Sequence, residues 1–257
     1  MTPARTADPP PGGLRLTVLG CDGSYPGPGG AGSGYLIESR GTRLWLDAGP
    51  GTLANLQRHL PLSGLDAVVV SHEHPDHCRD LEGLAVAVGM LERRDLPVYA
   101  PVGLRSTLYH DTASVFDWRE VSDGEAAGVG PLRLRFSRTD HGPVTLAVRI
   151  DAGVRAIGYS ADSGPGWSLE ALGPGLDLAL CEATYTRAFE GRFQHMSARQ
   201  AGESGRRAGA RKLVLTHRWP TIPARAVRDE GRRAFGGPVA LARTGSVYEI
   251  GASEEAS

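Results

Sequence analysis

The hexapeptide His72-Glu-His-Pro-Asp-His77 places four side chains that can bind metals within six positions. It follows Ala67-Val-Val-Val, an apolar run that predicts a buried strand. Residues two apart on an extended chain point the same way, so His72 and His74 can bind one ion, and the following turn can direct Asp76 and His77 toward a second. Left without a metal, the cluster would carry a high desolvation and like-charge cost. The segment therefore predicts a metal site rather than a polar loop with satisfied histidines.

Three further candidate ligands lie downstream, each where a predicted strand begins or ends. His141 precedes a strand, Asp162 follows one and His217 follows another. Taken singly, Asp162 could be a turn aspartate, and either histidine could be a loop or helix-capping residue. Two coordination shells need more donors than one hexapeptide supplies, so the joint placement of the three residues favours metal ligation.

The apolar pattern predicts many short strands interrupted by helices. Leu132, Leu134 and Phe136 alternate with polar residues as in a strand, whereas Leu81, Leu84 and their successors recur at helical spacing. Strands are expected at 14–19, 34–37, 42–47, 67–70, 97–100, 132–136, 144–150, 156–159, 177–181 and 212–216 and near 239 and 247, and helices at 52–59, 81–91, 197–208 and 223–235. Two strand-rich halves with helices predict an α/β fold, a four-layer αββα sandwich.

The composition suits many tight turns in one domain. The chain of 257 residues contains 35 glycines and 18 prolines scattered between the apolar runs. We expect one domain over residues 14–250, a loose N-terminal tail over 1–13 and a C-terminal tail over 251–257.

Charge and cysteine content narrow the function classes. The formal net charge of −1 lacks the basic excess of a protein that grips extended nucleic acid, which favours a small substrate. Three cysteines without paired spacing favour a reducing compartment. The chain has neither a run of roughly 20 apolar residues nor the apolar segment of a secretory signal. We therefore expect a cytoplasmic protein without a membrane partner.

In motif order and in flanking segments, the sequence resembles the metallo-β-lactamase superfamily from Leu16-Thr-Val-Leu-Gly through Leu215-Thr-His. The resemblance implies two divalent metal ions. Zn²⁺ is the metal that we expect, and Mn²⁺ and Fe²⁺ are the alternatives. It assigns the first ion to His72, His74 and His141, the second to Asp76, His77 and His217, a bridging role to Asp162, and support of a ligand histidine to Asp47.

Charge counting at this implied centre favours an anionic substrate. Two divalent ions, two ionised aspartates and a bridging hydroxide leave a formal +1, because the histidines bind as neutral imidazoles. Such a centre attracts a phosphodiester and lowers the pKa of the bridging water toward ~7, with Asp76 helping to position the attacking hydroxide. The same ligands also occur in lactonases and thioesterases of the superfamily, so other residues must decide.

Two segments, Cys181-Glu-Ala-Thr-Tyr and Gln194-His-Met-Ser, resemble the branch that contains ribonuclease Z and related cyclic-nucleotide phosphodiesterases. The resemblance implies an acid pair in which Glu182 orients His195 and His195 protonates the departing oxygen or holds a phosphoryl oxygen. The alternatives are a Glu182 paired with an arginine such as Arg187 and a solvent-facing His195.

The segment between His141 and Asp162 departs from the ribonuclease Z pattern. Only twenty residues intervene, and two strands with the turn Asp151-Ala-Gly-Val account for them, so no tRNA-clamping arm fits. Leu19-Gly-Cys-Asp-Gly and Ser33-Gly-Tyr-Leu-Ile resemble actinobacterial cyclic-AMP phosphodiesterases of this fold. We therefore predict hydrolysis of a small phosphodiester, first of all 3′,5′-cyclic AMP. The alternatives are tRNA 3′ processing, lactone or thioester hydrolysis, and a binding protein whose metal site is structural.

The glycine-rich loop from Gly20 to Gly34 either contacts the substrate or is only a long hairpin loop. We expect Ser24 and Ser33 to contact substrate, and Ser197, where the endonucleases carry threonine, is a further candidate. A homodimer is expected because superfamily relatives commonly pair.

Overall fold

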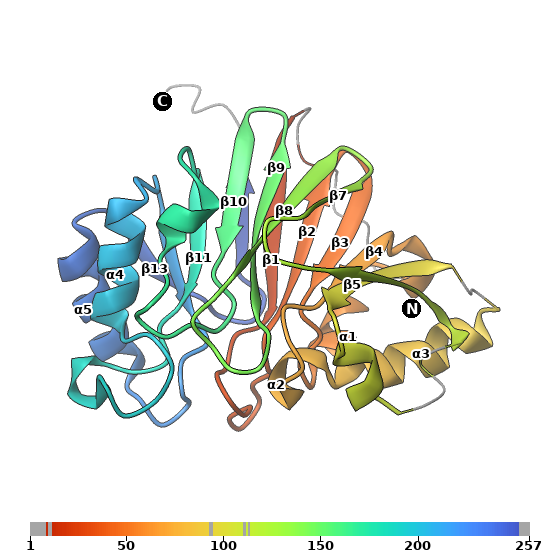
Figure 1. Cartoon of the computed structure of the whole chain (residues 1–257), viewed down its shortest axis with the longest axis horizontal. Coiled ribbons are helices and arrows are strands. Elements are labelled where there is room, and N and C mark those ends of the chain that lie inside the picture. The colour runs from red at the N-terminus through yellow and green to blue at the C-terminus, as the bar shows by residue number, and fades with distance from the viewer. Residues whose placement is uncertain (1–8, 10–11, 93–94, 110–111, 113, 252–257) are drawn as a thin grey trace.

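The structure is a computed structural model that describes residues 9, 12–92, 95–109, 112 and 114–251. Two β-sheets are stacked face to face, and helices lie on their outer faces (Figure 1). The four-layer αββα sandwich expected from the sequence is confirmed. The two tails expected at 1–13 and 251–257 lie for the most part outside the described residues.

The first sheet has seven strands in the order β14-β1-β2-β3-β4-β5-β6. They are β1 (Leu14–Gly20), β2 (Gly34–Ser39), β3 (Thr42–Leu46), β4 (Ala67–Val69), β5 (Leu96–Pro101), β6 (Phe116–Val121) and β14 (Val247–Ile250). Neighbours are antiparallel from β14 to β3 and parallel from β3 to β6.

The second sheet repeats this plan with seven strands in the order β13-β12-β11-β10-β9-β8-β7. They are β7 (Ala126–Val129), β8 (Leu132–Arg138), β9 (Leu146–Ala152), β10 (Arg155–Tyr159), β11 (Leu178–Glu182), β12 (Leu213–Thr216) and β13 (Val239–Leu241). Neighbours are antiparallel from β7 to β10 and parallel from β10 to β13. The parallel strands of each sheet therefore end at one common edge.

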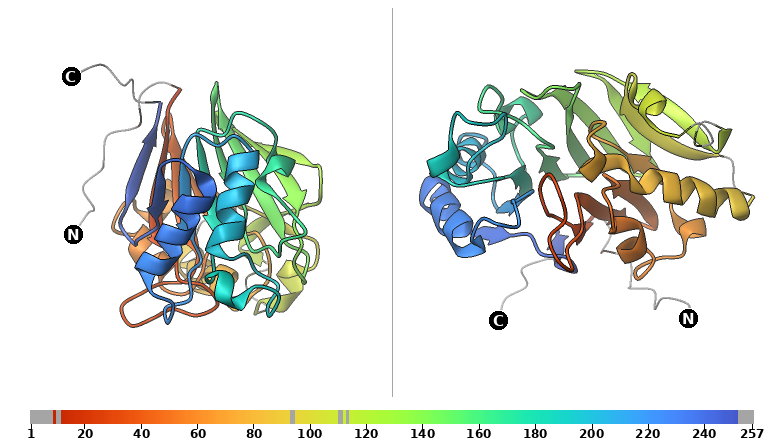
Figure 2. Two further views of the ribbon diagram at one scale, coloured as in Figure 1. Left: turned by 90° about the vertical axis from the view of Figure 1, so that its left-hand side faces the viewer. Right: turned by 90° about the horizontal axis from the view of Figure 1, so that it is seen from below.

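Helices cover both outer faces, as the side view in Figure 2 shows for the second sheet. The α-helices are α1 (Thr52–Leu56), α2 (Pro75–Cys78), α3 (Asp80–Met90), α4 (Ala198–Arg207) and α5 (Ala224–Phe235), and the 3₁₀ helices are η1 (Leu62–Gly64), η2 (Leu104–Thr107), η4 (Leu169–Leu172) and η5 (Arg187–Phe189). The α1 and α3 helices pack on the first sheet, and α4 and α5 on the second. No helix among the described residues is long and apolar enough to cross a membrane.

Burial on both faces explains why β4 reads as an unbroken apolar run. Ala67 and Val69 point into the core between the sheets, whereas Val68 and Val70 join a second core beneath α3. A strand with one exposed face alternates instead, as β8 does with buried Leu134 between exposed arginines. The chain thus runs from a strand buried on both faces directly into the hexapeptide from His72 to His77, whose candidate ligands His72, Asp76 and His77 are themselves buried.

The predicted strands and helices are all present within a few residues of their expected ends, but two strands were missed. Helix α1 ends at Leu56, three residues earlier than expected. The missed strands β6 and β7 each form one edge of a sheet and are largely exposed. The polar pattern of β6 and the small residues of β7 gave no strand period, because neither strand is buried on a whole face.

Helices α4 and α5 pack closely enough to require glycine. A Cβ atom added to Gly202 in α4 would lie 2.6 Å from the carbonyl oxygen of Gly231 in α5. Gly89, near the end of α3, has no atom within 4 Å of its Cβ position.

We therefore predict that Gly202→Ala lowers the free energy of unfolding by about 1–3 kcal/mol, because the two helices must move apart. The matched change Gly89→Ala should raise it by about 0.5–1 kcal/mol through better helix propensity. Urea unfolding of both variants measures the difference, and equal stabilities would contradict the packing described for α4 and α5.

Candidate metal centre

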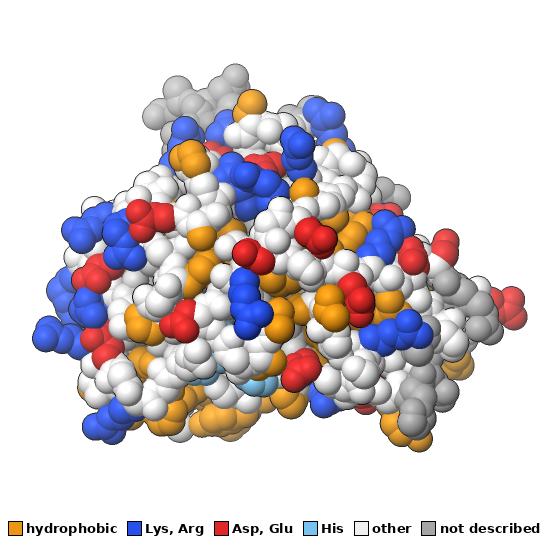
Figure 3. Space-filling model, in the orientation of Figure 1, with side chains coloured by type: hydrophobic (Ala, Val, Ile, Leu, Met, Phe, Trp, Pro, Cys, Tyr) orange, Lys and Arg blue, Asp and Glu red, His pale blue; other side chains and the backbone are white. Residues whose placement is uncertain are grey.

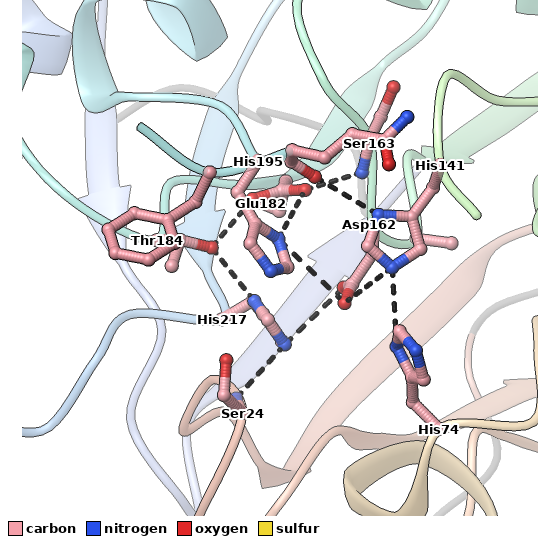
Figure 4. Close-up of polar contacts among 12 residues, drawn as sticks. Ser24, His74, His141, Asp162, Ser163, Glu182, Thr184, His195 and His217 are labelled. Atoms are coloured by element: carbon pink, nitrogen blue, oxygen red, sulfur yellow. Dashed lines mark hydrogen bonds and ion pairs between the residues drawn. The ribbon is translucent and has the colours of Figure 1, made fainter. Parts of the chain in front are cut away.

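Seven histidine and aspartate side chains converge from loops at the strand ends of both sheets and from the short helix α2, at the lower edge of the molecule in Figure 1. Figure 4 shows four of them, His74, His141, Asp162 and His217. Asp47 follows β3, His72 comes after β4, Asp162 after β10 and His217 after β12. Asp47 and His217 have φ angles of 57° and 55°, in the left-handed region that non-glycine residues seldom adopt. Such backbone outliers cluster at functional sites.

The first group of donor atoms comes from His72, His74, His141 and Asp162, all within 4.8 Å of one another. Nδ1 of His74 lies 3.0 Å from Nε2 of His72 and 3.2 Å from Nε2 of His141. Oδ2 of Asp162 is 3.6 Å from Nε2 of His72. These are the residues that the resemblance assigned to the first ion and to the bridge.

The second group comes from Asp76, His77 and His217 and is buried. Oδ2 of Asp76 lies 3.1 Å from Nε2 of His217 and 3.5 Å from Nε2 of His77. Oδ1 of Asp162 completes the arrangement, 3.2 Å from Nε2 of His77 and 3.4 Å from Nε2 of His217. The two oxygens of Asp162 thus face different groups, as a bridging ligand requires.

The donor atoms fit divalent cations. Nε2 of His77 and Oδ1 of Asp162 are buried, are not aligned for a hydrogen bond with each other, and have no other hydrogen-bond partner among the described residues. An unsatisfied buried polar atom is costly. Imidazole nitrogens and carboxylate oxygens in groups of three and four are the donors of zinc sites. Cations bound here would give both buried atoms a partner.

The electrostatics also favour bound cations. Burial opposes the charged form of both carboxylates, but His77 and His217 outweigh it and hold the pKa of Asp76 and that of Asp162 well below their usual range. Burial also opposes a charge on His77, yet Asp162, Asp76 and Asp47 raise its pKa well above the usual value. Burial first, and then His77, lowers the pKa of His72 well below its usual value. The centre concentrates negative charge that metal ions would neutralise.

Asp47, to which the resemblance assigned the support of a ligand histidine, lies behind the centre in contact with His77. Its Oδ2 accepts hydrogen bonds from Nδ1 of His77 at 2.7 Å, from the hydroxyl of Tyr159 at 2.6 Å and from Oγ of Ser71 at 2.8 Å. Ser71 in turn accepts from Nδ1 of His72 at 3.0 Å. These contacts hold both rings with Nε2 toward the centre, so that Nε2 is the nitrogen that would bind a metal ion.

Buried Glu182 and partly exposed His195 form a pair beside the two groups. Oε1 of Glu182 is 3.2 Å from Nδ1 of His195, and Nδ1 of His195 is 3.9 Å from Oδ2 of Asp162. Burial lowers the pKa of His195, but the Glu182 carboxylate outweighs it and raises the pKa to about 9. Among the described residues, the Glu182 carboxylate is contacted by His195, by the Thr184 hydroxyl and by the backbone N–H groups of Ser163 and Met196, and it has no arginine partner. The alternative of an arginine-paired Glu182 is therefore wrong.

The same His195 could also serve as a ligand. Asp162, His195 and His217 form a third group of donor atoms within 4.8 Å. The His195 side chain is 14% exposed, whereas that of His217 is only 2% exposed. His195 therefore lies nearer to the solvent than His217 does.

Thr184 links Glu182 to the second group, a role that sequence reasoning missed. Its hydroxyl donates to Oε2 of Glu182 at 2.6 Å and accepts from Nδ1 of His217 at 2.9 Å. His217 is thereby fixed with Nε2 toward Asp76, and Glu182 serves the acid pair and a candidate ligand together (Figure 4). The only signal in the sequence was that Thr184 stands two residues after Glu182 at a strand end.

Asp140 is a second residue that sequence reasoning missed. Its carboxylate accepts from the backbone N–H of Gly166 at 2.8 Å and from the side-chain amide of Gln194 at 3.1 Å. The carbonyl oxygen of Gln194 accepts from Nδ1 of His141 at 3.0 Å. Asp140 therefore ties together three loops that carry candidate site residues.

The three serines expected to contact substrate have different positions. The Ser24 N–H lies 3.3 Å from Nε2 of His217, so this residue borders the centre. Ser33 is buried and its N–H donates to the carbonyl oxygen of Asp76, so its backbone supports the ligand loop. The expectation for Ser197 is wrong, because its buried hydroxyl caps α4 and donates to Glu190.

The comparisons with known proteins identify the family. The family model described as Beta-lactamase superfamily domain matches residues 42–218. The chain belongs to this superfamily and, with its histidine and aspartate groups, is a metal-dependent hydrolase.

Three similar proteins agree with this class. An uncharacterized protein of Mycobacterium leprae is 35% identical over 94% of this chain and 90% of its own length. A probable metallo-hydrolase of Bacillus subtilis, YhfI, is 32% identical over 92% of this chain and 100% of its own length. The crystal structure of YhfI matches this structure with a TM-score of 0.86 and covers 92% of this chain and 99% of that one. A ribonuclease Z of Methanopyrus kandleri is 28% identical over 92% of this chain and 98% of its own.

We predict that Thr184→Val weakens Zn²⁺ binding about 10–100-fold, because His217 loses the acceptor that fixes its ring. Thr184→Ser keeps that hydroxyl and should bind Zn²⁺ like the parent chain. Competition with a chromophoric chelator measures the affinity, and thermal unfolding of the metal-free variants controls for a general loss of stability. An unchanged affinity in Thr184→Val would show that the hydroxyl does not orient the ligand.

Proposed function

We propose that the chain is a dinuclear metal-dependent phosphodiesterase that hydrolyses small cyclic nucleotides, with 3′,5′-cyclic AMP as the first substrate to test. The observation that carries the proposal is the Glu182–His195 pair, whose imidazole lies 3.9 Å from the Asp162 carboxylate. A proton donor next to a metal centre suits the cleavage of an ester whose leaving oxygen is a poor leaving group.

The two donor groups would each hold one ion, with Asp162 shared between them. Two divalent ions in such a site supply a nucleophilic water at neutral pH and neutralise the charge that develops on the attacking and leaving oxygens. The lowered pKa values of Asp76 and Asp162 support this assignment, because ionised carboxylates are the form that binds cations.

Three residues of the chain, Asp76, His195 and Glu182, have further roles in the proposed reaction. Asp76, whose Oδ2 lies between His77 and His217, is placed to orient the attacking water. His195 holds a proton at the rim and transfers it to the ribose oxygen as the phosphorus–oxygen ester bond breaks. Glu182 keeps the His195 ring in position and stabilises its charged form.

The compact hairpin of β9 and β10 favours a small substrate. Strands β9 and β10 are joined by the tight turn at Gly153 and Val154, and they account for the chain between His141 and Asp162. No projecting arm is present in this described segment. The net charge of −1 also supports a small phosphodiester over an extended nucleic acid.

Endonucleolytic tRNA 3′ processing is the second candidate function. The similarity to the ribonuclease Z of Methanopyrus kandleri, at 28% identity over nearly both chains, is the observation that favours it. The same acid pair would serve that reaction, so the size of the substrate separates the two candidates.

A panel of four substrates tests the proposal: cyclic AMP, bis(p-nitrophenyl) phosphate, an acyl-homoserine lactone and a precursor tRNA. The Zn²⁺- or Mn²⁺-loaded protein is expected to hydrolyse the first two and to lose both activities on chelation. Efficient cleavage of the precursor tRNA without cyclic AMP turnover would select the second candidate. Turnover of the lactone alone would contradict phosphodiester chemistry.

The role of His195 is tested by the leaving group. His195→Ala is expected to lower kcat for cyclic AMP about 10²–10⁴-fold, because the ribose oxygen needs a proton. The loss should be far smaller with bis(p-nitrophenyl) phosphate, since nitrophenolate leaves without one. Metal content, measured on the same samples, should not change. Equal losses on both substrates, or loss of metal, would make His195 a ligand rather than an acid.

A further inference from the structure

Aromatic side chains border the metal centre on the side of His195 and His217. Phe193 stands two residues before His195, and Trp219 stands two residues after His217. The Trp219 indole Nε1–H donates to Oγ of Ser24, which itself borders His217. Figure 3 shows hydrophobic side chains gathered along the lower edge of the molecule beside the histidines. We call Phe189, Phe193 and Trp219 the aromatic rim.

The rings of the aromatic rim are held in a fixed arrangement. Phe193 meets Trp219 edge to face with ring centroids 5.0 Å apart, and Phe189 meets Trp219 in the same way at 6.1 Å. Tyr185 lies buried beneath them, 5.6 Å from Trp219. Its hydroxyl is shared between the carbonyl oxygens of Phe193 at 2.9 Å and of His195 at 2.7 Å. One buried residue thus positions both the aromatic rim and the proton donor.

The aromatic rim offers ring faces and few polar groups. Phe193 is 48% exposed, a large apolar ring left in water next to reactive groups. The Trp219 Nε1–H and the Tyr185 hydroxyl are both already engaged in hydrogen bonds. The guanidinium of Arg192 lies over the ring of Phe189 at 5.5 Å and adds a flat cation to the surface. The three rings of the aromatic rim can stack on a planar ligand, and they offer no free polar group to its hydrogen-bonding edge.

We infer that the aromatic rim is a stacking subsite for the nucleobase of a nucleotide substrate. The inference rests on the proposed phosphodiesterase function, because the base must be attached to the phosphate that the metal centre receives. Stacking on an aromatic side chain is tolerant of base identity, since every base has a π face. The aromatic rim therefore predicts a preference for phosphodiesters that carry a base, with weak discrimination between adenine and guanine.

Two substrates and two exposed aromatic residues test the inference. Cyclic AMP is compared with the base-free ribose 3′,5′-cyclic phosphate in the parent chain and in Phe193→Ala. The substitution is expected to raise KM for cyclic AMP about 5–150-fold, toward the value for the base-free compound, which corresponds to about 1–3 kcal/mol of stacking. Phe193→Tyr should restore the low KM. Tyr109→Ala, at an exposed tyrosine beside α3, should leave both KM values at the parent level.

Product binding separates this inference from the proposed function. Calorimetry of the Zn²⁺-loaded parent chain should show AMP binding more tightly than ribose 5-phosphate, with the difference reduced in Phe193→Ala. Hydrolysis of both cyclic phosphates with equal KM values would overturn the stacking subsite and leave the phosphodiesterase intact. Equal binding of AMP and ribose 5-phosphate would overturn it whether or not either diester is hydrolysed. Absence of all phosphodiester turnover would contradict the proposed function instead.

Discussion

The contact on which the site depends is that of the Asp162 carboxylate with imidazoles from both halves of the chain. One oxygen faces His72 and the other faces His77 and His217, and the carboxylate is almost fully buried. Burying an ionised carboxylate among imidazole nitrogens is unfavourable unless cations complete the arrangement. The sandwich fold makes such a site possible, because the parallel strands of both sheets end on the same side of the molecule and bring the loops with the candidate ligands together.

Glu182 connects His195 to the second group of candidate ligands. It accepts from His195 directly and reaches His217 through the hydroxyl of Thr184. A shift of the Glu182 side chain would therefore disturb the proton donor and a candidate ligand together. Tyr185, three residues further along the chain, anchors the loop of His195 from the other side. The end of β11 thus organises the side of the site that carries Glu182, Thr184 and His195.

Much of this could be predicted from the sequence, for identifiable reasons. The hexapeptide from His72 to His77 is compact enough for its spacing to predict its geometry, and strand periodicity gave the buried elements because both sheets are covered. The contacts of Thr184 and Asp140 depend on which loops the strand order places side by side, which no local pattern encodes. Ser197 was misassigned because the same serine suits a helix cap and a substrate contact, and the fold uses the cap.

The most direct test of the account is the metal content of the purified chain and of Asp162→Asn, which keeps the shape of the side chain and removes its charge. Elemental analysis by mass spectrometry should find about two divalent ions per parent chain. The variant should hold fewer ions, because the carboxylate that faces both groups is lost. A parent chain without stoichiometric metal, or an Asp162→Asn chain that binds metal like the parent, would contradict the shared centre described here.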